Sequence, residues 1–78
     1  MARIIDGTQM NLIGNKVRYF RKKAHLSQRE LSDKLELLGV YVCRGSISRI
    51  EEHVRTVTDI ELFALSKVLG VSMDDLIE

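Results

Sequence analysis

The sequence predicts an all-α fold of five short helices in one domain. Three segments share one helix-start signal, a serine or threonine followed three positions later by a glutamate or aspartate. Elsewhere, apolar residues recur at the three- and four-residue spacing of an amphipathic helix, and the chain contains no proline. The run from Val40 to Val42 is too short and too close to loop signals to predict a strand.

The first helix is predicted from about Leu12 to Ala24, because apolar residues follow helical spacing at Ile13, Val17, Phe20 and Ala24. The second is predicted from Gln28 to about Leu38. Its start is fixed by a capping box between Ser27 and Glu30, and its inward residues are expected to be Leu31, Leu35 and Leu38. Gly39 suits the left-handed residue that ends such a helix.

The third helix is predicted from about Arg44 to His53, with an inward stripe of Ile47, Ile50 and Val54. The outward face then carries Gly45, Ser48 and Arg49, with Arg44 further round at the helix start. An alternative is a loop followed by a helix that begins later, at Ser46. A start at Arg44 has a physical reason, because a first turn without large side chains lets the helix backbone approach a partner closely.

Two further capping boxes predict the last helices. Thr58 and Glu61 begin a helix from Asp59 to Leu69, which Gly70 ends, and Ser72 and Asp75 begin a helix from Met73 to the end of the chain. Residues 1–10 show no periodicity and are predicted to form a flexible arm before a domain of residues 11–78.

Length and composition limit the function classes. A chain of 78 residues forms one small domain that buries about 60% of its extended surface. No apolar run approaches the roughly 18 residues of a membrane span, and no signal peptide is evident, so a soluble cytoplasmic protein is expected. The single cysteine, Cys43, excludes an internal disulfide and fits a reducing compartment.

The net charge of +1 conceals an uneven distribution along the chain. Residues 1–30 carry seven basic side chains against two acidic ones, whereas residues 56–78 carry one against five. One end of the molecule is therefore suited to an anionic partner, although a basic run can also be an ordinary solvated helix face. At the start of the third helix, free amides and the helix dipole favour phosphate, and two arginines have the fork that matches guanine O6 and N7.

Three motifs together resemble the phage repressor-like (Cro/cI, XRE-type) helix-turn-helix family. They are Ser27-Gln28-x-x-Leu31 with Leu35, the run from Ser46 to Glu51, and Leu65-x-x-x-Leu69-Gly70-Val71-Ser72 with Leu76. The resemblance implies a five-helix lambda-repressor-like domain with a helix-turn-helix at about Gln28 to His53. It covers about Leu12 to Glu78.

The resemblance also implies roles for individual residues. Those expected to read DNA bases from the third helix are Arg44, Gly45, Ser48 and Arg49, of which the two arginines are the principal readers. Phosphate contact or positioning is expected from Gln28, Cys43, Ser46, Arg55, Lys16 and Arg18. Arg21 is expected to pair with Glu51 and join the first helix to the third.

The sequence departs from the family in one place. Gln28 to Ile47 spans 19 positions, about five more than this family usually has, and the extra residues fall around Glu36 to Val42. We expect the second helix to be about one turn longer than usual and Val40 or Val42 to fold back onto the core.

No motif for catalysis, a cofactor or a small-molecule ligand is present, so the protein is not expected to be an enzyme. His25, Cys43 and His53 lack metal-ligand spacing, and no metal site is predicted.

The function predicted is a sequence-specific transcriptional regulator, a repressor, that binds a partly palindromic DNA operator as a homodimer. The dimer surface is expected to comprise Val71, Met73, Leu76 and Ile77. Two alternatives stay open: an antitoxin or restriction-modification controller with the same DNA-binding mode, and a protein-interaction module that reads no DNA and docks through its acidic C-terminal segment.

Overall fold

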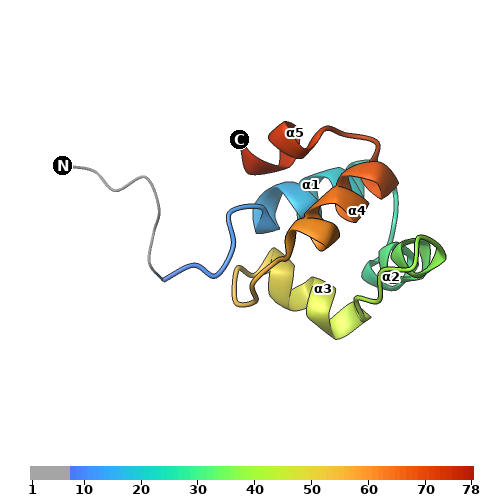
Figure 1. Ribbon diagram of the computed structural model, residues 1–78, viewed down its shortest axis with the longest axis horizontal. Coiled ribbons are helices and arrows are strands. Elements are labelled where there is room, and N and C mark those ends of the chain that lie inside the picture. Colours follow the sequence, from blue (N-terminus) through green and yellow to red (C-terminus); the bar gives the residue numbers. More distant parts are fainter. Residues whose placement is uncertain (1–7) are drawn as a thin grey trace.

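The computed structural model describes residues 8–78 and contains five helices in this part of the chain (Figure 1). They are α1 (Gly14–Lys23), α2 (Gln28–Leu37), α3 (Arg44–Glu51), α4 (Asp59–Leu69) and α5 (Met73–Ile77). No strand is found among residues 8–78. The all-α prediction is confirmed, and the predicted bounds of α4 agree with the structure.

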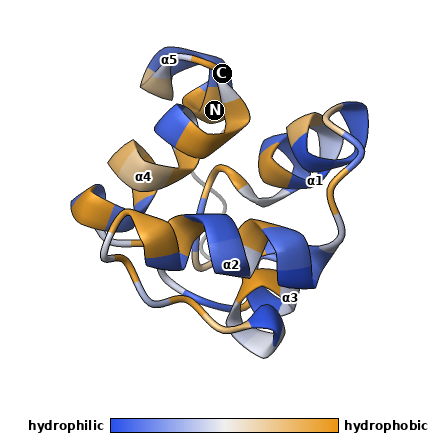
Figure 2. Ribbon diagram, turned by 90° about the vertical axis from the view of Figure 1, so that its right-hand side faces the viewer, coloured by the Kyte–Doolittle hydropathy of each residue, from blue (hydrophilic) through white to orange (hydrophobic). Residues whose placement is uncertain are grey.

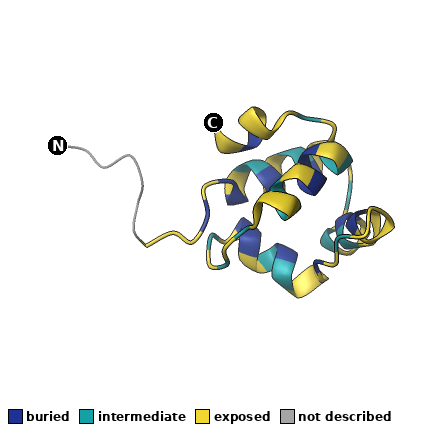
Figure 3. Cartoon of the chain, in the orientation of Figure 1, coloured by how far each residue is buried: buried dark blue, intermediate teal, exposed yellow. Residues whose placement is uncertain are grey.

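The helices surround one core, with α3 along the lower edge of the molecule and α5 at the top in Figure 1. α1 and α4 lie between them, and α2 contacts both α3 and α4. Each helix turns its apolar side inward, as the colour banding of α1 and α2 in Figure 2 and the dark inner faces in Figure 3 show. The largest fully buried side chains are Val17, Leu31, Leu35, Ile47, Ile50, Leu65 and Leu76.

Reciprocal capping boxes begin three helices, as predicted. The Ser27 hydroxyl accepts from the Glu30 amide at 3.0 Å, and the Glu30 carboxylate accepts from the Ser27 amide at 2.9 Å. This carboxylate bonding to the Ser27 backbone lowers the pKa of Glu30. Equivalent pairs begin α4 and α5. Each box satisfies two backbone donors that a helix start would otherwise leave unpaired.

Four helices end in the same way, with one residue in the left-handed region. Gly39 and Gly70 take positive φ as expected, and so do two histidines, His25 and His53. In each case the next amide bonds back to a carbonyl five residues earlier, for example Val40 to Leu35 at 3.0 Å. This is the Schellman motif, and the two histidines in it were missed because glycine is its usual residue.

Three residues that were expected to face the core are exposed, because the helices end before them or beside them in Schellman motifs. Val54 was expected inward but is 57% exposed, because α3 ends at Glu51 and the reversal at His53 turns the chain away from the helical stripe. Leu38 is 54% exposed for the same reason, since it lies past the last residue of α2. Ala24 is exposed just beyond the end of α1.

The extended turn between α2 and α3 is packed, as predicted for Val40 or Val42. Val42 is 3% exposed and belongs to the core, and Val40 packs against it while partly buried. The Ser32 hydroxyl on α2 donates to the Val42 carbonyl at 2.6 Å. The turn is therefore held by both side-chain burial and a hydrogen bond.

The segment before α1 is joined to the loop after α3. The Met10 amide donates to the His53 carbonyl at 2.9 Å, so the last residue of the predicted arm is attached to the domain. Thr8 and Gln9 of that arm are exposed, and residues 1–7 lie outside the described residues. Within residues 8–78, no helix is long and apolar enough to cross a membrane.

Candidate nucleic-acid interface

α3 begins at Arg44, and Cys43 is its N-cap residue, with φ −69° and ψ 163°. The alternative of a helix beginning at Ser46 is therefore wrong. Ile47 and Ile50 lie in the core, so the opposite side of α3 faces outward. That exposed side lies along the lower edge of the molecule in Figure 1, away from α5.

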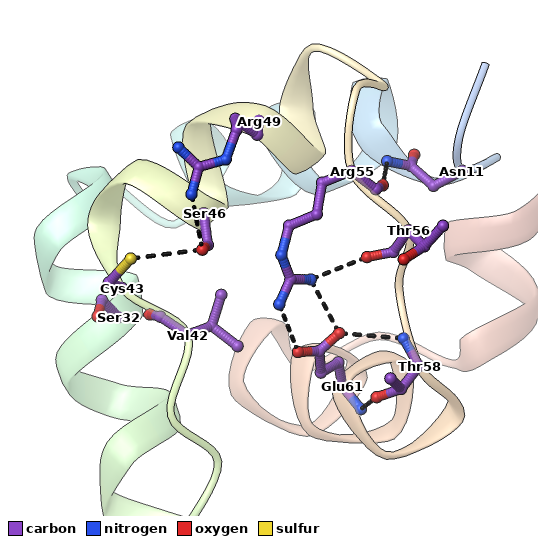
Figure 4. A network of polar contacts seen from close by, with 10 residues as sticks. All are labelled: Asn11, Ser32, Val42, Cys43, Ser46, Arg49, Arg55, Thr56, Thr58 and Glu61. Carbon is purple, nitrogen blue, oxygen red and sulfur yellow. Dashed lines mark hydrogen bonds and ion pairs between the residues drawn. The ribbon is translucent and has the colours of Figure 1, made fainter. Parts of the chain in front are cut away.

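The outer side of the first two turns of α3 carries a chain of polar contacts (Figure 4). The Arg49 Nη2 atom donates to the Ser46 hydroxyl at 3.2 Å, and the same hydroxyl lies 3.3 Å from the Cys43 sulfur. Hydrogen bonding by the Ser46 side chain lowers the pKa of the Cys43 thiol, and the Ser46 amide lowers it further. This edge of α3 therefore favours negative charge.

The other predicted base readers lie on the same exposed side. Arg44 and Gly45 are exposed, and a Cβ atom built on Gly45 would meet only the Arg49 Nη1 atom, at 3.6 Å. The Ser48 hydroxyl donates to Glu52 at 3.1 Å, which places a carboxylate at the C-terminal end of this surface. The two arginines of α3, Arg44 and Arg49, thus both precede this carboxylate along the chain.

The predicted pair of Arg21 and Glu51 is present, and it is buried. Arg21 Nε and Nη2 donate to the two carboxylate oxygens of Glu51 at 2.6 and 3.0 Å, and their side chains are 10% and 3% exposed. The Gln28 amide also donates to Glu51 at 3.3 Å, and Arg21 donates to the Leu26 carbonyl. This network fixes α3 relative to α1 and the start of α2.

Two residues that the sequence analysis missed also hold the C-terminal end of α3. Asn11 is buried, its amide donates to the carbonyls of Ile50 and Arg55, and its oxygen accepts from the amides of Ile13 and Gly14. Gly14 lies where a Cβ atom would be 2.3 Å from the Ile50 carbonyl oxygen. A helix-start asparagine and a glycine just inside a helix are the local signals that could have found them.

Arg55, predicted to contact phosphate, is bound within the protein. Its two terminal nitrogens donate to the two carboxylate oxygens of Glu61 at 2.9 and 2.8 Å (Figure 4). These hydrogen bonds raise the pKa of Arg55 and lower that of Glu61. The pair ties the loop after α3 to the start of α4.

The basic side chains of α1 divide between two sides. At about 100° per residue, Arg18 and Lys22 lie within about 80° of Gly14, on the side that contacts α3. Lys16 lies about 160° from Gly14, so it points away from α3. The helix therefore places Arg18, and Lys22 in addition, beside the exposed surface of α3, and it does not bring Lys16 there.

The predicted dimer surface is only partly exposed. Leu76 is fully buried in the core, which corrects its assignment, and Val71 packs against that core. Met73 and Ile77 remain exposed. Ile77 borders a hollow of about 440 Å³ that is lined mainly by apolar atoms and that includes Met10, Leu12, Val57 and Leu62.

No group of three or more histidine, cysteine or acidic residues within residues 8–78 could hold a metal ion. His25 and His53 instead occupy helix ends. The His53 Nδ1 atom lies 3.1 Å from the Asn11 carbonyl, which accepts from it.

The comparisons with known proteins agree with this geometry. No curated protein matches the chain. A solved structure of the P22 c2 repressor protein in complex with synthetic operator 9T, in the presence of Tl⁺, is 32% identical, with a TM-score of 0.73. The match covers 87% of this chain and 96% of that one. The family model described as helix-turn-helix matches residues 17–76, so the chain belongs to the phage repressor-like helix-turn-helix family.

Proposed function

We propose that the protein is a DNA-binding transcriptional regulator, acting as a repressor, whose helix α3 enters the major groove of double-stranded DNA. The observation that carries the proposal is the exposed side of α3 with its two arginines, on a helix whose C-terminal end is fixed by buried contacts. A groove-reading helix must be rigidly aimed, because specificity depends on a few side chains reaching particular base edges. The P22 c2 repressor, which this chain resembles, was solved in complex with a synthetic operator.

In this proposal Arg44 and Arg49 read bases, since the guanidinium fork matches guanine O6 and N7. Gly45 allows the backbone to approach the groove, and Ser48 reads a base edge beside it. Cys43 and Ser46 contact phosphate at the start of the helix, where free amides favour an anion. Ser46 also positions Arg49 through their hydrogen bond.

Phosphates on the flanks of the site are contacted from the neighbouring helices. Gln28 lies at the start of α2, and its side chain donates to Glu51, so it braces α3. In the proposed complex, the backbone amides in the first turn of α2 face the backbone of the DNA. Arg18 and Lys22 supply positive charge from α1. Arg55 contributes mainly through the loop that it fixes with Glu61, and Lys16 has no part in the interface.

We propose a two-fold dimer across the apolar hollow bordered by Met10, Leu12 and Ile77. The segments that line it lie at the left in Figure 1, beside the C-terminal end of α3. Two copies joined there would present both α3 helices on one face. Such a dimer reads half-sites about 10 bp apart in a partly palindromic operator.

Fluorescence anisotropy with a labelled random-sequence duplex tests the DNA-binding part of the proposal. Binding should weaken steeply as salt rises, with a log–log slope of about −0.9 for each phosphate neutralised. The variant Arg18→Gln with Lys22→Gln should reduce the slope by about 2, while Lys16→Gln serves as the control and leaves it unchanged. A protein that binds no duplex even at low salt would instead be a protein-interaction module.

A further inference from the structure

We propose that the extended turn between α2 and α3 is a second DNA-contacting element, in which the Tyr41 hydroxyl donates a hydrogen bond to a backbone phosphate. The inference rests on the proposed function and adds a contact outside α3. The ligand group is a phosphodiester oxygen of the same duplex that α3 reads. The turn lies at the end of α3 opposite the apolar hollow, so this phosphate belongs to the outer flank of each half-site (Figure 1).

The turn is held in one conformation, as a contact element requires. Gly39, with φ +80°, ends α2, and the Val40 amide returns to the Leu35 carbonyl at 3.0 Å. Further along, Val42 is in the core and its carbonyl accepts from Ser32 at 2.6 Å. Tyr41 lies between these two anchored valines, so little backbone entropy remains to be lost when the side chain binds.

Exposure alternates along this segment. Val40 is partly buried, Tyr41 is 77% exposed, Val42 is buried, and Cys43 is exposed. An extended backbone directs successive side chains to opposite sides, so Tyr41 and Cys43 point outward on the same side. Cys43 caps α3 and contacts Ser46 on the proposed DNA-facing edge (Figure 4). Tyr41 therefore extends that edge beyond the helix.

A hollow of about 360 Å³ joins Tyr41 to the start of α3. It is lined by Ser32, Glu36, Tyr41, Val42, Cys43 and Ser46. Tyrosine is the longest of these side chains, and Tyr41 is largely exposed. Within residues 8–78 the Tyr41 hydroxyl has no hydrogen-bond partner, and tyrosine hydroxyls are among the groups that contact DNA phosphates. The Glu36 carboxylate opposes the contact by repelling the same phosphate.

The test compares Tyr41→Phe with Tyr19→Phe in the full chain. Both tyrosines are exposed and each variant keeps its ring, but Tyr19 lies about 140° round α1 from Gly14, away from α3. Against a duplex selected by the wild type, Tyr41→Phe should weaken binding about tenfold and Tyr19→Phe should not. The salt slope should stay unchanged, because the phenol carries no charge. Glu36→Gln should strengthen binding at low salt.

Duplexes with a single neutral methylphosphonate locate the contact. At one flanking position the substitution should weaken the wild type, and Tyr41→Phe should then cause no further loss. Equal affinities for the two phenylalanine variants would overturn the inference alone. A Tyr41→Phe protein that selects a different base sequence would show base reading instead of phosphate contact, which also overturns it. A wild type that binds no duplex would contradict the proposed function as well.

Discussion

At the scale of single residues, Gly14 marks the closest approach of α1 to α3. A Cβ atom there would lie 2.3 Å from the Ile50 carbonyl oxygen, which belongs to the backbone. Gly14→Ala should lower the free energy of unfolding by about 3 kcal/mol, because α3 must shift to make room. Urea denaturation measures the difference, and an unchanged midpoint would show that the two helices do not meet as described.

Gly45 provides the matched control on α3. A Cβ atom at this position makes only an ordinary contact with Arg49, so Gly45→Ala should raise the free energy of unfolding by up to about 1 kcal/mol. The added methyl group should nevertheless weaken DNA binding, since it holds the backbone away from the groove. A variant that is more stable and binds equally well would remove the close-approach role from Gly45.

The buried pair of Arg21 and Glu51 has more effect on stability than a surface ion pair. Glu51→Ala should lower the free energy of unfolding by about 3 to 5 kcal/mol, because Arg21 is left charged and buried without its partner. The double variant Arg21→Met with Glu51→Leu should recover much of that loss. A double-mutant cycle of Arg21→Met and Glu51→Leu measures the coupling energy between the two side chains. Losses of stability that simply add would contradict the direct pairing.

At the scale of helices, the two left-handed histidines weaken the helix ends that they form. His25→Gly should raise the free energy of unfolding by about 1 kcal/mol, because glycine takes positive φ without the steric cost of a Cβ atom. His53→Gly should gain less, since it loses the contact with the Asn11 carbonyl. Thermal melts of the two variants test the order, and a lower melting temperature for His25→Gly would contradict it.

The helix starts could be predicted because their determinants are local. A capping box places both partners within four residues, so Ser27 and Glu30 could be paired from the sequence alone. The helix ends were harder to predict from the sequence. The periodic pattern continues through Leu38 and Val54 although the helices have already ended, and nothing in a histidine requires positive φ.

The parts of the site that depend on distant residues could not be derived from spacing. Asn11 contacts Ile50 and Arg55 across about forty positions. Arg55 is placed against Glu61 by the loop between them, so its charge alone suggested an external partner. The link of Arg21 to Glu51 was predicted only through the family resemblance.

At the scale of the whole molecule, the pair of Arg55 and Glu61 couples stability to pH. Hydrogen bonding to Arg55 lowers the pKa of Glu61 in the folded protein below its unfolded value. The stabilisation is therefore present above the ordinary carboxylate pKa and is lost as pH falls through the lowered one. Glu61→Gln should cost about 1 kcal/mol at pH 7 and less at pH 3, as measured by urea denaturation. A cost that does not vary with pH would exclude this linkage.

The charge distribution along the chain becomes a distribution in space. α3 lies along one edge, and the acidic helix α5 lies at the opposite edge (Figure 1). DNA approaching the cationic edge therefore meets attraction there and little repulsion from the distant carboxylates. A net charge of +1 is consistent with DNA binding when it is divided in this way.

Selection of duplexes from a random DNA pool tests the central claim, that α3 reads a sequence. The wild type should enrich a partly palindromic site with half-sites about 10 bp apart. Arg49→Ala should select the same site with its preference relaxed at one base pair per half-site, at a cost of about 1 to 3 kcal/mol for the original sequence. No enrichment by the wild type, or identical selected sequences for the two proteins, would contradict the claim.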